Sequence, residues 1–242
     1  FFMNKKIRLY FSDKIQSDLI AHLLKEQSHY LKDVMRLKVG DLFSIFNSQG
    51  EWKTSIQNYE KQAVKIRILE KLRDKKDEKN IWLAFTPIKQ NPLNFIIQKG
   101  TELGVQKFIP ILSERTEVKA INKERIEKII IESVEQSNRI SVPEISNLKN
   151  LKNFLTNFPK KGCLIFCDIN CDKNDLKNIL SKEDMGPVCI LIGPEGDFSE
   201  NERKLIVELD QSKSISLAHN ILRTDTAAIA AITLVNYHLN LS

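Results

Sequence analysis

The sequence predicts an α/β protein in which a small β-rich domain precedes a larger domain with a parallel sheet. Up to residue 72, short segments alternate between apolar and polar residues at the spacing of a small barrel. After residue 80, short apolar segments alternate with helical segments, an order typical of an open α/β sheet. Residues 73–80 are almost all charged and have little to bury, so we expect a linker there.

The predicted elements of the first domain, residues 1–72, are short. The segment 41–47 alternates most regularly, as a strand with one buried face does. We expect strands at 6–11, 41–47, 51–59 and 63–69, a helix at 27–35 and a turn at 48–50. Strands of this number and spacing predict a small β-barrel.

The second domain, residues 81–242, contains segments that are apolar on both faces. Such segments are typical of parallel strands that helices cover on both sides. We expect strands at 81–85, 107–112, 164–168, 188–192 and 214–217.

The helices of this domain are predicted from their ends. Asn91 is a suitable N-cap, and Gly104 suits the C-terminal stop of the same helix. Ser199 and Glu202 have the spacing of a capping box, which predicts a helix from there to about residue 209. The remaining helices are expected at 123–138 and from a cap at Thr224 or Asp225 to about residue 240.

The net charge is concentrated in the first third of the chain. The formal charge of the 242 residues is +6. Residues 1–80 hold 17 basic and 11 acidic side chains, so they account for the whole excess. A basic module of this kind suits a polyanion such as RNA, although a lysine-rich solvated surface would show the same excess.

Several function classes lack their sequence signals. Neither a dinucleotide-binding G-x-G-x-x-G nor a P-loop occurs. Cys163, Cys167 and Cys171 are spaced unlike the ligands of zinc or iron–sulfur sites, so we expect no metal. No apolar run approaches the roughly 20 residues that span a bilayer. With few cysteines and no recognisable targeting segment, the pattern favours a cytoplasmic protein without a membrane partner.

Two segments lead from a predicted strand into a predicted helix and carry unusual residues. They are LIGPEGDFS at 191–199 and SLAHNILRTDT at 216–226. Ligands of open α/β sheets bind beyond the carboxyl ends of the strands, so both segments are candidates for a binding site. A plain strand-to-helix turn explains the first segment equally well. The helix that follows the second is apolar on nearly every face, which indicates burial in the core or at an oligomer interface.

Together these segments resemble the RsmE family, the 16S rRNA (uracil-N3)-methyltransferases of the SPOUT superfamily. The most specific parts are LIGPEG at 191–196 and ILRTDTA at 221–227. Independent support comes from QKGTELG at 98–104, SER at 113–115 and EQS at 135–137. In the first domain, RLY at 8–10 and HYLKDVMRLKVGD at 29–41 are similar to the family's PUA-like RNA-binding barrel. The resemblance covers nearly the whole chain.

The resemblance implies S-adenosylmethionine (SAM) as methyl donor, a homodimer and a deep trefoil knot in the C-terminal domain. The chain departs from the family pattern at four positions. Asp197 and Asn138 stand where glycine is usual, and both residue types tolerate a positive φ. Ala218 also replaces a usual glycine, beside the cofactor, and there we expect a negative φ or a slightly more distant cofactor. Asp33 replaces a more common basic residue.

The site residues follow from the resemblance and from these positions. Arg223 is expected near the reacting base, where a cation stabilises negative charge, and Glu195, Asp225 or bulk water could accept a proton. The residues expected to bind the cofactor are Ile192, Gly193, Pro194, Gly196, Leu217, Ala218, Asn220, Ile221, Leu222 and Thr224. RNA phosphates are expected to contact Arg8, Lys32, Arg36 and Lys38.

The implied activity is SAM-dependent methylation of N3 of a uridine in the 16S rRNA of the 30S ribosomal subunit. No DNA partner is expected. Two alternatives stay open at this point. One is an RNA-binding ribosome-assembly module with a vestigial catalytic domain, and the other is a SPOUT enzyme that methylates a ribose 2′-OH.

Overall fold

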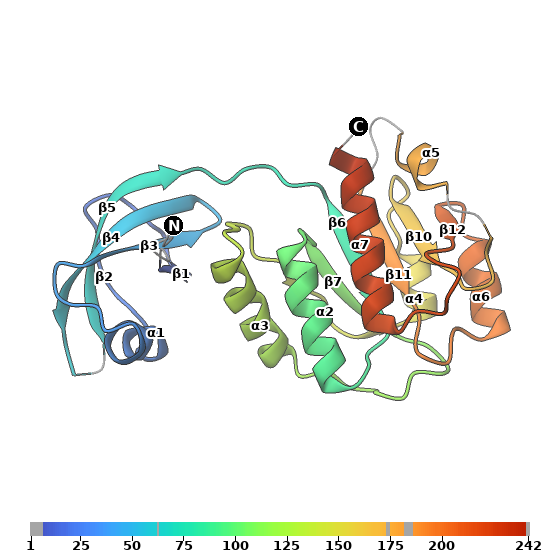
Figure 1. The fold of residues 1–242 in the computed structure, drawn as a ribbon, viewed down its shortest axis with the longest axis horizontal. Coiled ribbons are helices and arrows are strands. Elements are labelled where there is room, and N and C mark those ends of the chain that lie inside the picture. The colour runs from blue at the N-terminus through green and yellow to red at the C-terminus, as the bar shows by residue number, and fades with distance from the viewer. Residues whose placement is uncertain (1–6, 62, 173–174, 182–185, 241–242) are drawn as a thin grey trace. The chain divides into compact units, whose positions relative to one another are not determined.

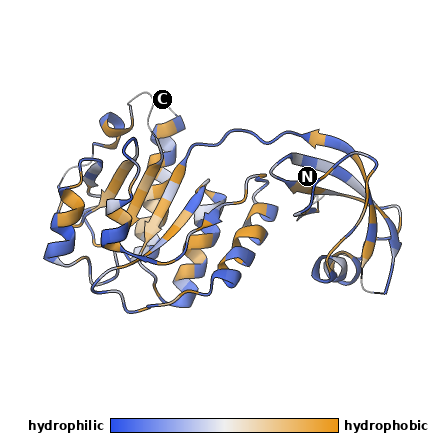
Figure 2. Cartoon of the chain, turned by 180° about the vertical axis from the view of Figure 1, so that it is seen from behind, coloured by the Kyte–Doolittle hydropathy of each residue, from blue (hydrophilic) through white to orange (hydrophobic). Residues whose placement is uncertain are grey.

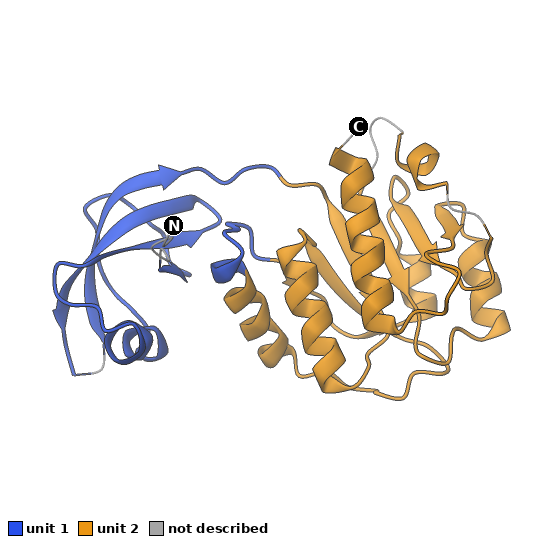
Figure 3. Ribbon diagram, in the orientation of Figure 1, with its two compact units in different colours: residues 1–77, 134–142 blue, residues 78–133, 143–242 orange. Residues whose placement is uncertain are grey.

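The chain forms two compact units in the computed structural model, which describes residues 7–61, 63–172, 175–181 and 186–240. Unit 1 contains residues 1–77 and 134–142, and unit 2 contains residues 78–133 and 143–242 (Figure 3). The sequence patterns give no sign that residues 134–142 join the first unit. These residues belong to unit 1 because hydrogen bonds link them to residues that lie far away in the chain.

Unit 1 is organised around a five-stranded sheet. Its strands lie in the order β1 (Arg8–Tyr10), β3 (Leu42–Asn47), β4 (Gly50–Tyr59), β5 (Val64–Arg73) and β2 (Ile20–His22). β1 pairs with β3 in parallel, and the other neighbours are antiparallel. The four predicted strands are therefore confirmed. β2 was not predicted because it has only three residues, of which the two at its ends are exposed.

The predicted helix at 27–35 is a composite element that begins earlier. It consists of α1 (Lys25–His29) and a π-helical segment, η1 (Tyr30–Val34). The N–H of Met35 donates to the carbonyl of Tyr30 across this wide turn at 2.9 Å. The chain then leaves the helix through Arg36 in the left-handed region, at φ 55°.

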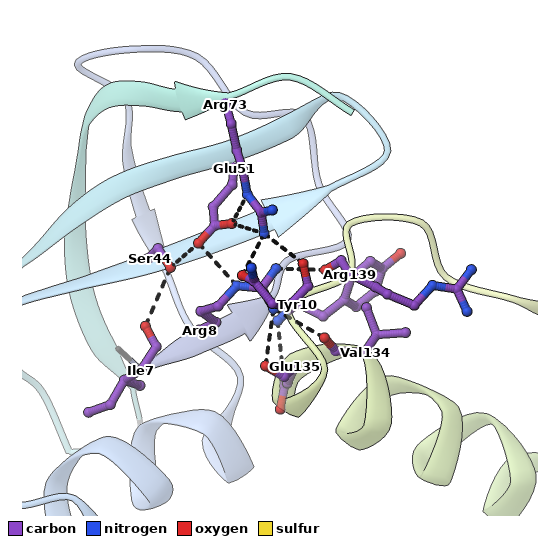
Figure 4. A network of polar contacts seen from close by, with 10 residues as sticks. Ile7, Arg8, Tyr10, Ser44, Glu51, Arg73, Val134, Glu135 and Arg139 are labelled. Carbon is purple, nitrogen blue, oxygen red and sulfur yellow. Dashed lines mark hydrogen bonds and ion pairs between the residues drawn. The ribbon is translucent and has the colours of Figure 1, made fainter. Parts of the chain in front are cut away.

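Arg8 is the centre of a buried polar network in unit 1 (Figure 4). Its Nε donates to the Glu51 carboxylate at 3.1 Å, and Nη1 donates to the carbonyls of Val134 and Glu135, each at 3.1 Å. Its Nη2 donates to the carbonyl of Arg139 at 2.6 Å. The side chain is only 5 % exposed and its guanidinium is bonded within unit 1, so the structure contradicts the prediction that Arg8 contacts RNA phosphates. Its guanidinium instead fastens residues 134–142 to β1 and β4.

Glu51 is the acceptor that balances two guanidinium groups in this network. It is 5 % exposed and accepts hydrogen bonds from Ser44, Arg8 and Arg73 at 2.6, 3.1 and 2.7 Å. Burial alone would raise its pKa, but these three hydrogen bonds hold the pKa below its ordinary value. Arg73 also donates to Asn138, whose φ of 63° confirms that an asparagine holds the expected left-handed turn.

We predict that Glu51→Gln destabilises unit 1 by about 3–5 kcal/mol at neutral pH, because it leaves buried cations without their counter-charge. Since the folded-state pKa of Glu51 is lowered, its contribution is full above about pH 4.3, the ordinary value. That contribution is lost as the pH falls through the lowered pKa. The stability gap between wild type and variant should therefore narrow in acid, which thermal unfolding at pH 3 to 7 would measure.

Glu70→Gln is the matched control, because Glu70 pairs with Lys53 on the surface and its side chain is 66 % exposed. A Glu51→Gln variant no less stable than this control would contradict the structural role of the network.

Unit 2 contains a seven-stranded parallel sheet (Figure 1). The strand order is β12 (Ser212–Ile215), β10 (Cys163–Cys167), β11 (Val188–Ile192), β6 (Ile81–Phe85), β7 (Lys107–Leu112) and β8 (Glu144–Ile145), with β9 (Lys149–Asn150) also beside β7. Every pair is parallel, as predicted. The central strands are hydrophobic along their length (Figure 2), which fits burial on both faces.

Helices cover both faces of this sheet. On one face α7 (Thr224–Asn240) packs against β11, with α2 (Gln90–Glu102) and α5 (Leu176–Leu180) beside it. On the other face α4 (Leu151–Thr156) and α6 (Glu200–Val207) share a hydrophobic cluster with alternate residues of the strands. The remaining long helix is α3 (Lys123–Gln136). No helix in the described part of the chain is long and apolar enough to cross a membrane.

The helix ends confirm two of the four predicted signals. Ser199 and Glu202 form the expected capping box of α6, and Gly104 follows α2 with a φ of 94°. The prediction for Asn91 is wrong, because α2 begins at Gln90 and its N-cap is Lys89, which makes no side-chain cap. Asn91 therefore lies inside the first turn of α2 and not at the N-cap position. The predicted cap at Thr224 or Asp225 is wrong, because α7 begins at Thr224 and both residues lie inside the helix.

Candidate functional site

A cavity of about 270 Å³ lies at the carboxyl ends of β10, β11 and β12 in unit 2. Three segments form its wall: the end of β10, the loop after β11, and the chain from the end of β12 into α7. The lining residues are Cys167, Asp168, Ile169, Ile192, Gly193, Pro194, Glu195, Asp197, Ser216, Leu217, Ala218, His219, Asn220, Ile221, Leu222, Arg223, Thr224 and Ala227. The two segments that the sequence singled out therefore meet at one site.

Most of the predicted cofactor residues line this cavity. The exception is Gly196, which lies in the same turn between Glu195 and Asp197 but does not line the wall. Arg223 and Glu195, the predicted catalytic residues, are both exposed and both line the cavity. Asp225 lies in the first turn of α7, next to Thr224, and is not part of the lining.

The loop after β11 is a tight turn that is held by hydrogen bonds between its own residues. Asp197 has a φ of 58°, which confirms that it takes the left-handed conformation expected at this position. Its N–H donates to the carbonyl of Pro194 at 3.0 Å, and its carboxylate accepts from the N–H of Phe198 at 2.8 Å. Phe198 is buried and packs edge-to-face on Phe166, with 5.7 Å between the ring centroids. The loop is thus anchored in the hydrophobic core at one end.

The second loop, between β12 and α7, is more open. Ile221 is 83 % exposed although it is apolar. Arg223 directly precedes α7, and its carbonyl accepts the N–H of Ala227 at 2.8 Å, so it lies at the positive end of the helix dipole. Ala218 is not in the left-handed region, so the methyl group at this position causes no backbone strain.

Asp168 is a site residue that the sequence patterns missed. Its carboxylate is fully buried at the end of β10 and accepts two hydrogen bonds from Arg203 of α6, at 3.1 and 2.8 Å. The hydrogen bonds to Asp168 raise the pKa of Arg203. One signal in the sequence could have indicated Asp168. It is an acidic residue at the carboxyl end of a predicted buried strand, where a carboxylate needs a partner.

The cavity combines apolar walls with charged side chains of both signs. Ile192, Ile221 and Leu222 provide apolar surface, and two loops expose backbone groups beside them. Glu195 and Asp197 add carboxylates, while Arg203 balances the charge of Asp168. Such a site suits a small molecule with a flat ring and a cationic centre. In the described part of the chain no three His, Cys, Asp or Glu side chains gather closely enough to hold a metal ion.

The remaining residues predicted to contact RNA lie in unit 1, on η1 and the turn after it. Lys32, Arg36 and Lys38 are all exposed. Lys32 places its Nζ 5.8 Å from the centre of the Tyr59 ring, and the N–H of Lys38 donates to Asp41. The structure brings these three residues together on one short segment and separates them from the buried Arg8.

Comparison with protein families identifies both parts of the chain. Residues 75–236 match the RNA methyltransferase domain, and residues 23–69 match the RNA methyltransferase PUA domain. Relatives named ribosomal RNA small subunit methyltransferase E include those of Rickettsia conorii and Bacillus subtilis. The first is 32 % identical and the match covers 94 % of each chain; the second is 30 % identical with 89 % coverage of each. The chain belongs to this RNA methyltransferase family.

Two solved methyltransferase structures have the same fold. A methyltransferase from Legionella pneumophila, in complex with bound SAM, superposes with a TM-score of 0.86 at 29 % identity, over 96 % of this chain and 97 % of the other. The family member from Neisseria gonorrhoeae, bound to S-adenosyl methionine, gives a TM-score of 0.85 at 26 % identity with the same coverage.

Two glycines of the loop after β11 make a matched pair of variants. A Cβ at Gly193 would stand 3.0 and 3.2 Å from ring atoms of Phe198, so the buried ring would have to shift. We expect Gly193→Ala to lower the free energy of unfolding by about 1–3 kcal/mol. A Cβ at Gly196 would meet only Arg115 atoms, at 3.8 Å or more, so Gly196→Ala should change stability by less than about 0.5 kcal/mol. Urea unfolding measures both, and equal effects would show that the ring does not restrict the loop.

Proposed function

We propose that this protein transfers a methyl group from SAM to N3 of a uridine in the 16S rRNA of the small ribosomal subunit. The observation that carries the proposal is the convergence of residues 191–199 and 216–226 on one cavity. The solved relatives described as SAM complexes have this same fold.

The residues of the cavity fit SAM in three respects. The apolar side chains of Ile192, Ile221 and Leu222 suit the faces of an adenine ring. Backbone groups of both loops can read its polar edge, with Gly193 allowing close approach. The carboxylates of Glu195 and Asp197 suit a cationic sulfonium. Pro194, Leu217, Ala218, Asn220 and Thr224 complete the proposed wall.

SAM supplies a methyl group on a positively charged sulfur. The chain must make N3 of the uridine a nucleophile, because this nitrogen carries a proton at neutral pH. Loss of that proton places negative charge on the ring and its carbonyl oxygens. Arg223 stabilises this charge, helped by the dipole of α7, which begins at the next residue. Glu195, exposed at the rim of the cavity, is the proposed proton acceptor.

Unit 1 is proposed to bind the RNA substrate. The family match to a PUA domain and the exposed Lys32, Arg36 and Lys38 support contacts to the phosphate backbone there. The target uridine must be unpaired or flipped out, because a Watson–Crick pair occupies N3.

The finer features of the fold are also proposals. They are closure of the first sheet into a PUA-like barrel, a trefoil knot in the second domain, the boundaries 1–72, 73–80 and 81–242, and a homodimer. The apolar α7, with Tyr237 61 % exposed, and the exposed Ile221 beside the cavity support an interface with a second copy.

The decisive test uses purified protein, SAM and 30S subunits, with mass spectrometry of the nucleosides formed. We expect N3-methyluridine from wild type. Arg223→Ala should lower kcat at least tenfold, about 1.4 kcal/mol, with unchanged affinity for S-adenosylhomocysteine. Arg223→Lys should recover part of the rate, because it keeps a positive charge.

A methyl group on a ribose oxygen would reject the base-methylation mechanism. A wild type that binds rRNA but neither binds the cofactor nor methylates would support the assembly-module alternative. A kcat of Arg223→Ala within tenfold of wild type would remove Arg223 from the mechanism.

The basic segment of unit 1 makes a separate prediction about salt dependence. Each phosphate contact should add about 0.7–0.9 to the slope of log affinity against log salt concentration. Lys32→Ala with Lys38→Ala should therefore reduce this slope by about 1.4–1.8, with cofactor affinity unchanged. Lys152→Ala, an exposed lysine of α4 in unit 2, is the control. An unaltered slope in the double variant would place the RNA elsewhere.

A further inference from the structure

The short turn at residues 113–116 follows β7. It contacts the loop after β11 but does not line the cavity. The turn is rigid by its own hydrogen bonds. The hydroxyl of Thr116, which is 4 % exposed, accepts the N–H of Ser113 at 2.8 Å, and the N–H of Thr116 donates to the carbonyl of Ser113 at 3.1 Å. Arg115 is therefore presented from a fixed backbone.

Arg115 lies along the outside of the loop after β11. Its Nη1 donates to the carbonyl of Gly196 at 2.8 Å and reaches the carbonyl of Phe198 at 3.5 Å. Its aliphatic stem covers Gly196, since a Cβ added there would stand 3.8 and 3.9 Å from stem atoms. One side chain thus joins the two carbonyls that flank Asp197, the residue in the left-handed conformation.

Glu202 ties the same turn to the start of α6. Its carboxylate is 7 % exposed and accepts the N–H of Glu114 at 2.9 Å and the N–H of Ser199 at 3.1 Å. The stretch 196–199 is therefore held at both ends by groups that reach the turn at 113–116: Arg115 at its beginning and Glu202 at its end.

We propose that Arg115 is a positioning residue that sets the cofactor-binding conformation of residues 193–198 before the cofactor arrives. This inference rests on the proposed function, which places the cofactor at this loop. A loop fixed in advance does not have to be ordered on binding, so more of the interaction energy appears as affinity. Arg115 acts through the backbone of Gly196 and Phe198, and not by contact with the cofactor.

The exposed position of Arg115 suggests one competing role, a contact to an RNA phosphate. The two roles separate experimentally. A positioning residue changes the order of the loop and the affinity for cofactor in the absence of RNA. A phosphate contact changes only RNA affinity and its salt dependence.

The first test is hydrogen–deuterium exchange on the protein without cofactor. Arg115→Ala should speed exchange in the peptide that covers residues 193–199, whose Asp197 N–H is bonded to Pro194. Exchange in α7 and in the strands of the sheet should stay as in wild type. Lys119→Ala, a nearby exposed cation with no contact to the loop in the structure, is the control and should change nothing.

The second test is calorimetry with S-adenosylhomocysteine. Arg115→Ala should weaken binding about tenfold, the scale of one charge-assisted hydrogen bond. Arg115→Lys should recover part of the loss, because a single nitrogen, Nη1, bonds both carbonyls and an ammonium nitrogen also carries enough N–H groups to do so. Thr116→Val keeps Arg115 but loosens the turn, so it should weaken binding too and add little to Arg115→Ala in the double variant.

Unchanged exchange in residues 193–199 of Arg115→Ala would overturn the proposal. So would unchanged cofactor affinity together with a salt slope for RNA that falls by about 0.7–0.9, the sign of a phosphate contact. If wild type binds no S-adenosylhomocysteine, the proposed function fails, while the exchange experiment still decides whether Arg115 orders the loop.

Discussion

The site of this protein depends on the parallel pairing of its central strands. In a parallel sheet all strands end at the same edge, so the chain segments that follow them are brought together whatever their distance in sequence. Phe166 of β10 pairs with Leu191 of β11 and with Ser214 of β12. Residues about 25 and 48 positions apart are thereby placed side by side, and the loops that follow them share one cavity.

Such an edge needs further support, because loops after strands have few hydrogen bonds of their own. Two buried carboxylates, Asp168 and Glu202, supply it in this protein. Asp168 at the end of β10 holds Arg203 of α6, and the neighbouring Glu202 holds the turn at residues 113–116. Two consecutive side chains on one helix therefore connect the ends of β7 and β10 with the loop after β11. The cost of burying these charges is offset by hydrogen bonds that satisfy each group.

Unit 1 also contains buried charged side chains that connect distant segments of the chain. Arg8 and Glu51 are buried in contact, and each has further partners, so neither charge is left unpaired. The network connects β1 and β4 with residues 134–142, which come from a distant part of the sequence (Figure 4). The basic residues of η1 and its following turn stay exposed on the surface. The charge excess of the first third thus has both a buried and an exposed component.

The sequence by itself determined the two kinds of sheet, the bounds of β6, β7 and β11, the capping box of α6 and the residues of the two loops. These features depend on periodicity and on local backbone chemistry, which neighbouring residues encode. The short elements β2, β8, β9, α4 and α5 were not predicted, because these segments of two to six residues lack the continuous apolar run that marks β6 and β11. Arg8 was assigned to the surface because a count of charges cannot distinguish an exposed arginine from one that is buried with a carboxylate. Only the tertiary structure decided that Arg8 meets Glu51, that Asp168 meets Arg203 and that Arg115 bonds the loop after β11. Each of these contacts joins residues at least 35 positions apart, and their partners are fixed by strand order and helix packing, which local sequence does not specify.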